Sequence, residues 1–201
     1  MPAISLSAAQ PLTGEAYVLQ AHGPDSPRRS HIESFVQARF QRSHGAQVRT
    51  FMPTLLSLHD SGNALRGVVG SRMASSGPLF LERYLDRPIE QLLGAYAAEK
   101  VARHEIVEVG NFACTDSVAA RELMKQLPWH LLREGAVWIV FTATDTVRGL
   151  LNILNAPLIE LACADEACVR GGCDEWGAYY ATDPRVMAGY LPNAYLLRHR
   201  A

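Results

Sequence analysis

The sequence predicts an α/β fold in which helices flank a mixed central β-sheet. Segments with helical spacing and short apolar segments of strand length succeed one another in the order helix, hairpin, strand, helix, strand, helix, strand. The 201 residues suit one well-packed domain, and no internal repeat or linker divides them. We therefore expect a single domain over residues 1–201, with an N-terminal extension (1–25) and an aromatic, turn-rich C-terminal tail (170–201).

A helix is predicted within residues 26–45. Ser30 and Glu33 have the spacing of a capping box, in which each side chain bonds the other residue's backbone N–H. Gly45 is a natural stop, because glycine adopts the left-handed conformation that ends many helices. Upstream, residues 16–21 fit one short strand. The apolar positions of the helix recur at helical spacing, namely Ile32, Phe35, Val36 and Phe40.

A β-hairpin is predicted over residues 55–74. Two apolar runs flank residues 60–63, whose sequence Asp-Ser-Gly-Asn is rich in turn-forming types. A helix then follows over residues 88–100, with Pro88 suited to its first turn.

The C-terminal half alternates strands with helices. Pro128 should kink the first of its helices, because proline lacks the N–H of the helical ladder and clashes with the preceding turn. Residues 173–191 show no clear period, so no element is predicted there. The predicted elements are strand 106–110, helix 117–134, strand 136–144, helix 145–154 and strand 158–164.

Charge and hydropathy exclude several classes of function. The net charge of −1 gives no reason to expect a nucleic-acid partner. The longest apolar stretch, residues 136–141, is strand-length, whereas a membrane span needs about 18 apolar residues. The N-terminus lacks the charged lead and long apolar core of a signal peptide, so we expect a cytoplasmic protein.

The cysteines favour free thiols over a metal site. Cys163, Cys168 and Cys173 are spaced at intervals of five, whereas zinc knuckles favour gaps of two, and no histidine lies near them. Cys114 stands apart from these three. We therefore expect no metal, and thiols in a reducing compartment.

Several stretches resemble the thermostable hemolysin family in their sequences and in their order, from about Arg28 to Gly189. That family is thought to share the GNAT-like acyltransferase fold, and its hemolysin name is an inherited label rather than a mechanism. The stretches are "HIESFVQARFQRSHGAQV", "FMPTLL", "VVGSRMASSGPLFLERYLDRPIEQLL", "IVEVGNFA", "WIVFTAT" and "WGAYYATDPRVMAG".

A second, shorter resemblance points to the same fold. The segment "VVGSRMASSGPLFLERYL" followed by "VEVGNFA" is similar to the acyl-homoserine-lactone synthases. Those enzymes have a Gly-x-Arg strand and then a Glu-bearing strand before the site of the acyl donor. The matching positions here are Gly70, Arg72 and Glu108.

The resemblance implies an acyl-CoA or a phosphopantetheine-linked acyl group as co-substrate, with no cofactor bound permanently. In the acyltransferase fold the fourth strand diverges from the fifth and offers unpaired backbone groups to pantetheine. The following helix N-terminus then receives phosphate through free N–H groups. The carried-over donor-binding residues are Gly110, Phe112, Ala113 and Cys114 along pantetheine, Ser117, Ala119, Ala120 and Arg121 near phosphate, and Thr142 and Thr144 at the end of the next strand.

Two departures from the acyltransferase pattern make the donor uncertain. The phosphate loop of typical members is glycine-rich, whereas residues 114–121 contain no glycine and place Asp116 where phosphate would sit. Asp116 is equally a good N-cap, so a plain capped helix start is the alternative. A carrier-protein-tethered acyl group is therefore a second donor to consider. The usual tyrosine acid is also missing, and Tyr179 or Tyr180 of the tail is the candidate replacement.

Glu108 is the first candidate for the catalytic carboxylate. It alternates with Val107 and Val109, so it faces opposite to them, and desolvation in a cleft would raise its pKa toward that of a usable base. The alternative is a solvent-facing strand residue.

Three further residues complete the predicted catalytic set. Arg72 could orient a carboxylate through its planar fork, or be a surface charge. Glu82 is a second cleft carboxylate or the surface partner of Arg83 or Arg87. Asn111 is expected to fix the diverging loop. Cys114 as a nucleophile would need a nearby base, and none is evident.

The sequence therefore favours an acyltransferase that moves an acyl group from a pantetheine thioester to a small amine, in specialised metabolism. Expected partners are the amine acceptor and, for a tethered donor, an acyl carrier protein. The oligomeric state is open, a homodimer included. Two alternatives remain: a non-catalytic acyl-binding module that lost the phosphate loop, and a membrane-active protein, which the missing amphipathic insertion segment argues against.

Overall fold

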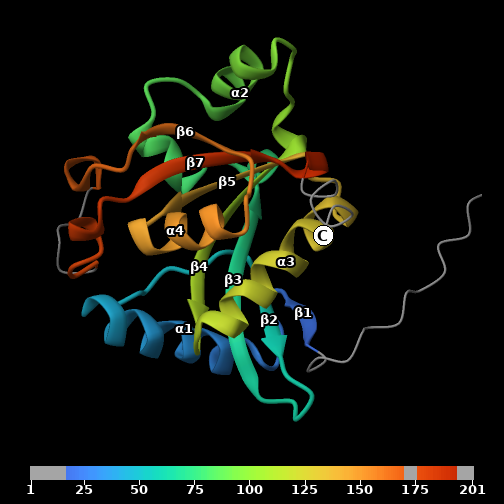
Figure 1. The fold of residues 1–201 in the computed structure, drawn as a ribbon, viewed down its shortest axis with the longest axis vertical. Coiled ribbons are helices and arrows are strands. Elements are labelled where there is room, and N and C mark those ends of the chain that lie inside the picture. Colours follow the sequence, from blue (N-terminus) through green and yellow to red (C-terminus); the bar gives the residue numbers. More distant parts are fainter. Residues whose placement is uncertain (1–16, 170–175, 194–201) are drawn as a thin grey trace, which may run out of the picture.

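Seven strands form one mixed sheet in the computed structural model, which describes residues 17–169 and 176–193 (Figure 1). The strand order is β1-β2-β3-β4-β5-β7-β6, and every neighbouring pair is antiparallel except β4 and β5, which run parallel. The predicted mixed sheet is confirmed. The strands are β1 (Val18–His22), β2 (Thr54–His59), β3 (Leu65–Met73), β4 (Ile106–Cys114), β5 (Trp138–Ala143), β6 (Leu158–Cys163) and β7 (Arg185–Tyr190).

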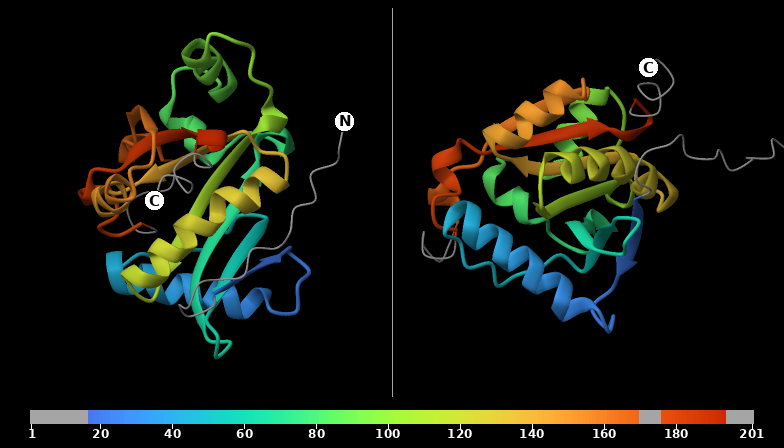
Figure 2. Two further views of the ribbon diagram at one scale, coloured as in Figure 1. Left: turned by 45° about the vertical axis from the view of Figure 1, so that its right-hand side comes forward. Right: turned by 60° about the horizontal axis from the view of Figure 1, so that its bottom comes forward.

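Helices cover both faces of the sheet (Figure 2). Successive strand residues point to opposite faces, and Val68 accordingly packs with α1 whereas Val69 packs with α3. The helices are α1 (Arg29–His44), α2 (Ile89–Ala97), α3 (Ser117–Arg133) and α4 (Asp145–Ile153). Short 3₁₀ turns are η1 (Ala74–Ser76), η2 (Phe80–Tyr84), η3 (Arg103–Glu105), η4 (Glu166–Cys168) and η5 (Tyr180–Thr182).

The segment between β3 and β4, residues 74–105, covers the α1 face of the C-terminal strands. Leu81 of η2 and Leu93 of α2 pack there against Trp138 and Val140 of β5. Ile139 and Phe141 point the other way and pack with the α3 cluster. The sheet therefore has an α3 and α4 face, and a second face shared by α1 and residues 74–105.

The ends of α1 differ in part from the prediction. The helix begins at Arg29, so Ser30 already lies in its first turn and no side chain caps it. Glu33 pairs with the Arg29 guanidinium at 2.7 Å instead, and the predicted capping box is wrong. Gly45 is confirmed as the stop, with φ 66° and its N–H donating to the carbonyl of Gln41.

The hairpin and the later elements follow the predicted pattern closely. Asp60 Oδ1 accepts hydrogen bonds from the N–H groups of Gly62 and Ala64, which closes the predicted turn. Pro88 is the N-cap of α2 rather than part of its first turn. Pro128 lies within α3, which continues as helix to Arg133.

One strand, β7, was not predicted. It lies in the tail between β5 and β6, and four of its six residues are buried. A strand covered on both faces shows no polar alternation, so it leaves no period of two in the sequence. The rest of the tail is described only in part, because residues 170–175 and 194–201, with Cys173 among them, lie outside the described residues, as do residues 1–16.

Strands β4 and β5 stay paired over only part of their length. Their register runs from Ile106 beside Trp138 to Val109 beside Phe141. Beyond Val109, β4 continues alongside β3, while β5 continues alongside β7. The two inner edges therefore diverge and expose backbone groups that no strand pairs.

Candidate functional site

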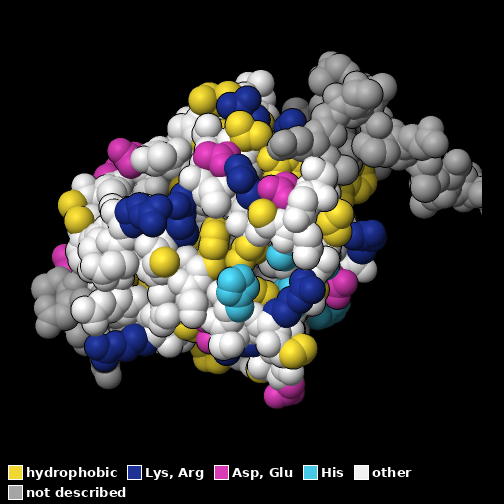
Figure 3. Space-filling view, turned by 90° about the horizontal axis from the view of Figure 1, so that it is seen from below, with side chains coloured by type: hydrophobic (Ala, Val, Ile, Leu, Met, Phe, Trp, Pro, Cys, Tyr) yellow, Lys and Arg dark blue, Asp and Glu magenta, His cyan; other side chains and the backbone are white. Residues whose placement is uncertain are grey.

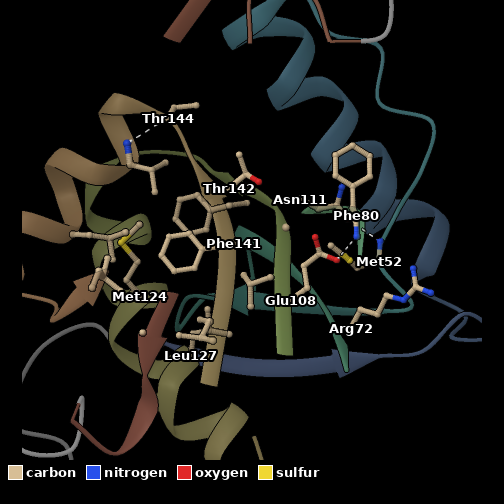
Figure 4. Close-up of a pocket in the computed structure, with 18 of the residues that line it drawn as sticks. Met52, Arg72, Phe80, Glu108, Asn111, Met124, Leu127, Phe141, Thr142 and Thr144 are labelled. Atoms are coloured by element: carbon tan, nitrogen blue, oxygen red, sulfur yellow. Dashed lines mark hydrogen bonds between the residues drawn. The ribbon is translucent and has the colours of Figure 1, made fainter. Parts of the chain in front are cut away.

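A cavity of about 910 Å³ occupies the gap where β4 and β5 diverge, with walls on both faces of the sheet. Figure 4 shows Met124 and Leu127 on one side of β4 and β5, and Arg72 and Phe80 on the other. Of the predicted site residues, those that line the cavity are Arg72, Glu108, Gly110, Asn111, Phe112, Thr142 and Thr144.

Glu108 is a buried carboxylate on the cavity wall. It is 3% exposed, and it accepts hydrogen bonds from Phe80 N to Oε2 and from Leu81 N to Oε1, each at 2.8 Å. Burial raises the pKa of this carboxyl, although the two N–H groups and the nearby Arg72 charge oppose that shift. The predicted orientation holds, because Val107 and Val109 pack on the α3 face.

Arg72 of β3 pairs in register with Glu108 and lines the same cavity. Its guanidinium makes no hydrogen bond or ion pair with another described residue, and its side chain extends from β3 away from Glu108 (Figure 4). An unpaired guanidinium at a cavity wall can bind an anionic group of a ligand.

Asn111 lies at the place where β4 leaves β5. It lies in a bulge of β4, with φ 51°, and its Oδ1 accepts the Met52 N–H at 2.8 Å. Met52 in turn packs against Gly70 and Gly110, where an added Cβ would lie 2.6 and 2.8 Å from its side-chain atoms. Glycine is therefore needed at Gly70, where the contact is with the Met52 Cβ, whereas at Gly110 the contact is with the flexible end of that side chain.

The N-terminus of α3, predicted to hold phosphate, is already capped. Asp116 Oδ1 accepts the N–H groups of Val118 and Ala119, both at 2.9 Å. Its Oδ2 pairs with the Arg66 guanidinium at 2.9 Å. Two of the N–H donors that a phosphate would use are thus taken.

Six predicted donor-binding residues lie outside the cavity. Ala113 packs with α1, and Ala119 packs in the α3 cluster. Burial raises the pKa of the Cys114 thiol to about 12, so it is no nucleophile at neutral pH. The alternation of β4 and the capped start of α3 turn these residues away from the cavity. The six are Ala113, Cys114, Ser117, Ala119, Ala120 and Arg121.

Glu82 has a structural environment rather than a catalytic one. Its carboxylate accepts the N–H groups of Leu79 and Ile89 and forms an ion pair with Arg103 at 2.7 Å. These bonds lower its pKa even though burial opposes them. The predicted partners, Arg83 and Arg87, are replaced by Arg103, and Glu82 does not line the cavity.

The strand that ends at the other side of the gap contributes two threonines. Thr142 lines the cavity from β5, and Thr144 caps α4 by accepting the Val147 N–H at 3.4 Å. Thr144 therefore has a structural role as well as its place on the wall.

An aromatic wall that the sequence did not predict stands beside Glu108. Trp176 lies 5.6 Å from Phe80 between ring centroids, and the Tyr84 and Tyr180 hydroxyls are 2.7 Å apart. Burial raises the pKa of both phenols. Gly177 holds the wall in place at φ 52°, where a Cβ would overlap the His44 carbonyl oxygen. The aromatic composition of "WGAYY" was the one sequence signal for this wall.

Other surfaces carry fewer indications of a ligand. On the face shown in Figure 3, basic and acidic side chains are interspersed. Among residues 17–169 and 176–193, no three His, Cys, Asp or Glu side chains cluster as metal ligands, and Cys163 and Cys168 are free and exposed. Within these same ranges, no helix is both long and apolar enough to cross a membrane.

The sequence model described as thermostable hemolysin matches residues 22–195. The chain belongs to the thermostable hemolysin family. The resemblance expected from the sequence is thereby confirmed over most of the chain. Among curated protein sequences, none matches this family member.

Solved structures share the fold of this thermostable hemolysin family protein. FeeM, an N-acyl amino acid synthase from uncultured soil microbes, superposes with a TM-score of 0.61 at 15% identity, covering 90% of this chain and 94% of FeeM. The acyl-homoserine-lactone synthase LasI gives 0.58 at 12% identity, covering 89% of this chain and 91% of LasI. BjaI, a CoA-dependent acyl-homoserine lactone synthase solved with SAM and isopentyl-CoA, gives 0.56 at 10% identity, covering 92% and 89%. The predicted GNAT-like acyltransferase fold is confirmed.

Proposed function

We propose that the protein transfers an acyl group from a pantetheine thioester to the amine of a small molecule. The observation that carries this proposal is the cavity at the divergence of β4 and β5, with the buried Glu108 carboxylate on its wall. The names of the structural neighbours, which are synthases of N-acyl products, support the same class of reaction.

The proposed reaction needs one general base and one set of backbone groups that hold the acyl donor. The acceptor nitrogen attacks the thioester carbonyl carbon, a C–N bond forms, the C–S bond breaks, and the thiolate leaves. Glu108 takes the proton that the nitrogen loses, and the thiolate takes a proton in turn. The raised pKa of Glu108 suits this role, because a carboxylate with a higher pKa is a stronger base. Backbone groups on the unpaired inner edges of β4 and β5 hold the pantetheine chain.

The donor is held mainly by its pantetheine and acyl parts. Asp116 occupies the N–H groups of Val118 and Ala119, and its charge disfavours a phosphate at the start of α3. The protein then gains little from the nucleotide of coenzyme A. An acyl carrier protein, which presents a single phosphopantetheine phosphate, is the donor that this arrangement favours.

The test is a product assay with a panel of donors and acceptors. Purified protein is incubated with acyl-CoA, acyl-carrier-protein and S-acyl-N-acetylcysteamine donors, each with amino acids and simple amines. Mass spectrometry then detects the amide, and thiol release is measured in parallel. We expect an amide whose formation requires both substrates and an intact Glu108.

Glu160→Gln is the matched control, because Glu160 is an exposed carboxylate on β6 outside the cavity. Loss of product in Glu108→Gln but not in Glu160→Gln supports the proposal. If no donor yields an amide, and none binds in calorimetry, the proposal fails. Donor binding without any product would instead favour the non-catalytic acyl-binding module.

A further inference from the structure

Helix α4 has an apolar side that no part of residues 17–169 and 176–193 buries. The helix is amphipathic, yet none of its nine residues is buried. Val147, Leu151 and Leu154 recur at the spacing of one helical face, and all three line the cavity. Amphipathic helices normally bury such a face against the core, so this one faces a space suited to an apolar ligand.

The opposite walls of this space are apolar as well. Met124 of α3 and Phe141 of β5 lie across from the helix (Figure 4). Among the polar groups of α3 on this wall, the Gln126 amide donates to Glu122 at 2.8 Å, and Lys125 also lines the cavity. We call this part of the cavity the apolar chamber, and define it by Met124, Leu127, Ile139, Phe141, Val147, Leu151, Leu154 and Leu158.

The chamber and Glu108 lie on opposite faces of the sheet. Ile139 and Phe141 belong to the α3 face, whereas Glu108 bonds Phe80 and Leu81 on the other face. The gap between β4 and β5 joins the two parts. A thioester carbonyl in that gap would direct its acyl chain to one side and meet the amine from the other.

We propose that the apolar chamber binds the acyl chain of the donor, and that the donor is a medium- or long-chain fatty acyl thioester. This inference rests on the proposed function. The whole cavity, on both faces of the sheet, measures about 910 Å³, near the upper end of ligand pockets, and an acetyl group would offer only one methyl to the apolar residues of the chamber. Each methylene that enters an apolar site lowers the dissociation constant about three- to fourfold.

Leu151 is the residue with which α4 sets the chain length. It lies at the middle of the uncovered stripe, one turn from both neighbours. Leu151→Trp fills the chamber and should shift the preferred chain toward butanoyl, with a loss of about tenfold or more for dodecanoyl. Leu151→Ala enlarges the chamber and should spare the long chains.

The experiment compares acetyl, butanoyl, hexanoyl, octanoyl and dodecanoyl donors in two assays, amide formation and binding by calorimetry. S-acyl-N-acetylcysteamine thioesters serve as probes in both. Ile153→Trp is the matched control, because Ile153 is 70% exposed on the other side of α4 and does not line the cavity. Circular dichroism and thermal melts confirm that each variant folds.

The outcomes separate the two proposals. Tighter binding with chain length in the wild type, reversed by Leu151→Trp and unaffected by Ile153→Trp, supports the chamber. If acetyl is the best donor, or if Leu151→Trp leaves the chain-length profile unchanged, the chamber assignment is overturned while acyl transfer stands. If long chains bind but no amide forms, the chamber stands and the proposed function fails.

Discussion

Oε2 of Glu108 accepts the backbone N–H of Phe80 at 2.8 Å, across a sequence separation of 28 residues. Leu81 donates to Oε1 in the same way. The carboxylate that faces the cavity is therefore also the anchor of η2, which covers that part of the sheet. Catalytic and structural roles of this side chain have to be separated by the choice of variant.

Glu108→Gln tests both roles at once. The amide keeps one oxygen acceptor but turns an NH₂ toward a backbone donor, so one of the two bonds is lost. We expect amide formation to fall about 10²- to 10⁴-fold, as for loss of a general base. The free energy of unfolding should fall by about 1–3 kcal/mol, measured by urea denaturation. A variant with the wild-type rate would exclude Glu108 as the base.

The pH dependence of the reaction should report the same group. Burial raises the pKa of Glu108 above 4.5, and the rate needs its ionised form. kcat/KM should therefore rise with pH through the raised pKa, with a midpoint above that of an ordinary glutamate. The contribution of Glu108 to the free energy of unfolding has the opposite pH dependence. It is full below about pH 4.5 and is lost as pH rises through the pKa that Glu108 has in the folded protein. If kcat/KM of Glu108→Gln rose with pH through the same midpoint, Glu108 would not be the titrating group.

Asp116→Ala should trade stability for phosphate binding. The variant loses the cap on the N–H groups of Val118 and Ala119, at a cost of about 1 kcal/mol and a Tm lower by roughly 2–4 °C. The freed donors should then improve binding of acyl-CoA relative to the matching S-acyl-N-acetylcysteamine. Calorimetry measures both ligands, with Asp165→Ala, which removes the cap of η4, as the control. Unchanged relative affinities would show that phosphate never reaches α3.

Much of the fold was readable from the sequence because its elements obey local rules. The Asp60 turn, the Gly45 stop and the alternation of Glu108 with its valine neighbours each depend on residues close in the chain. The start of α1 was mispredicted because Ser30 offers a cap only if the chain is not already helical there. Strand β7 left no signal because both its faces are covered.

The site was less accessible to prediction because it depends on contacts between distant segments. Arg103 reaches Glu82 from 21 residues away, and nothing in "LFLERYL" indicates that partner. Trp176 meets Phe80 only once the tail is folded back onto η2. The uncovered face of α4 is likewise a property of the cavity, since its sequence is that of an ordinary amphipathic helix.

Cys114 should be unreactive in the folded protein. Burial, followed by the negative charge of Asp116, raises the pKa of its thiol to about 12, and Arg39 only partly opposes this. Cys163 and Cys168 are exposed. Brief treatment with iodoacetamide should alkylate these two cysteines and leave Cys114 unmodified until the protein is denatured, as peptide mass spectrometry would show. Rapid alkylation of native Cys114 would contradict the raised pKa of its thiol.

Asn111 should be replaceable neither by alanine nor by glycine, but for different reasons. Both variants lose the bond from Met52 N to Oδ1, which ties the cavity wall to β4. Alanine must in addition adopt φ 51°, which costs about 1–2 kcal/mol, whereas glycine tolerates that conformation. We expect the free energy of unfolding to decrease from wild type to Asn111→Gly to Asn111→Ala in urea denaturation. Equal stability of the two variants would mean that the bulge relaxes, and that Asn111 does not hold β4 away from β5.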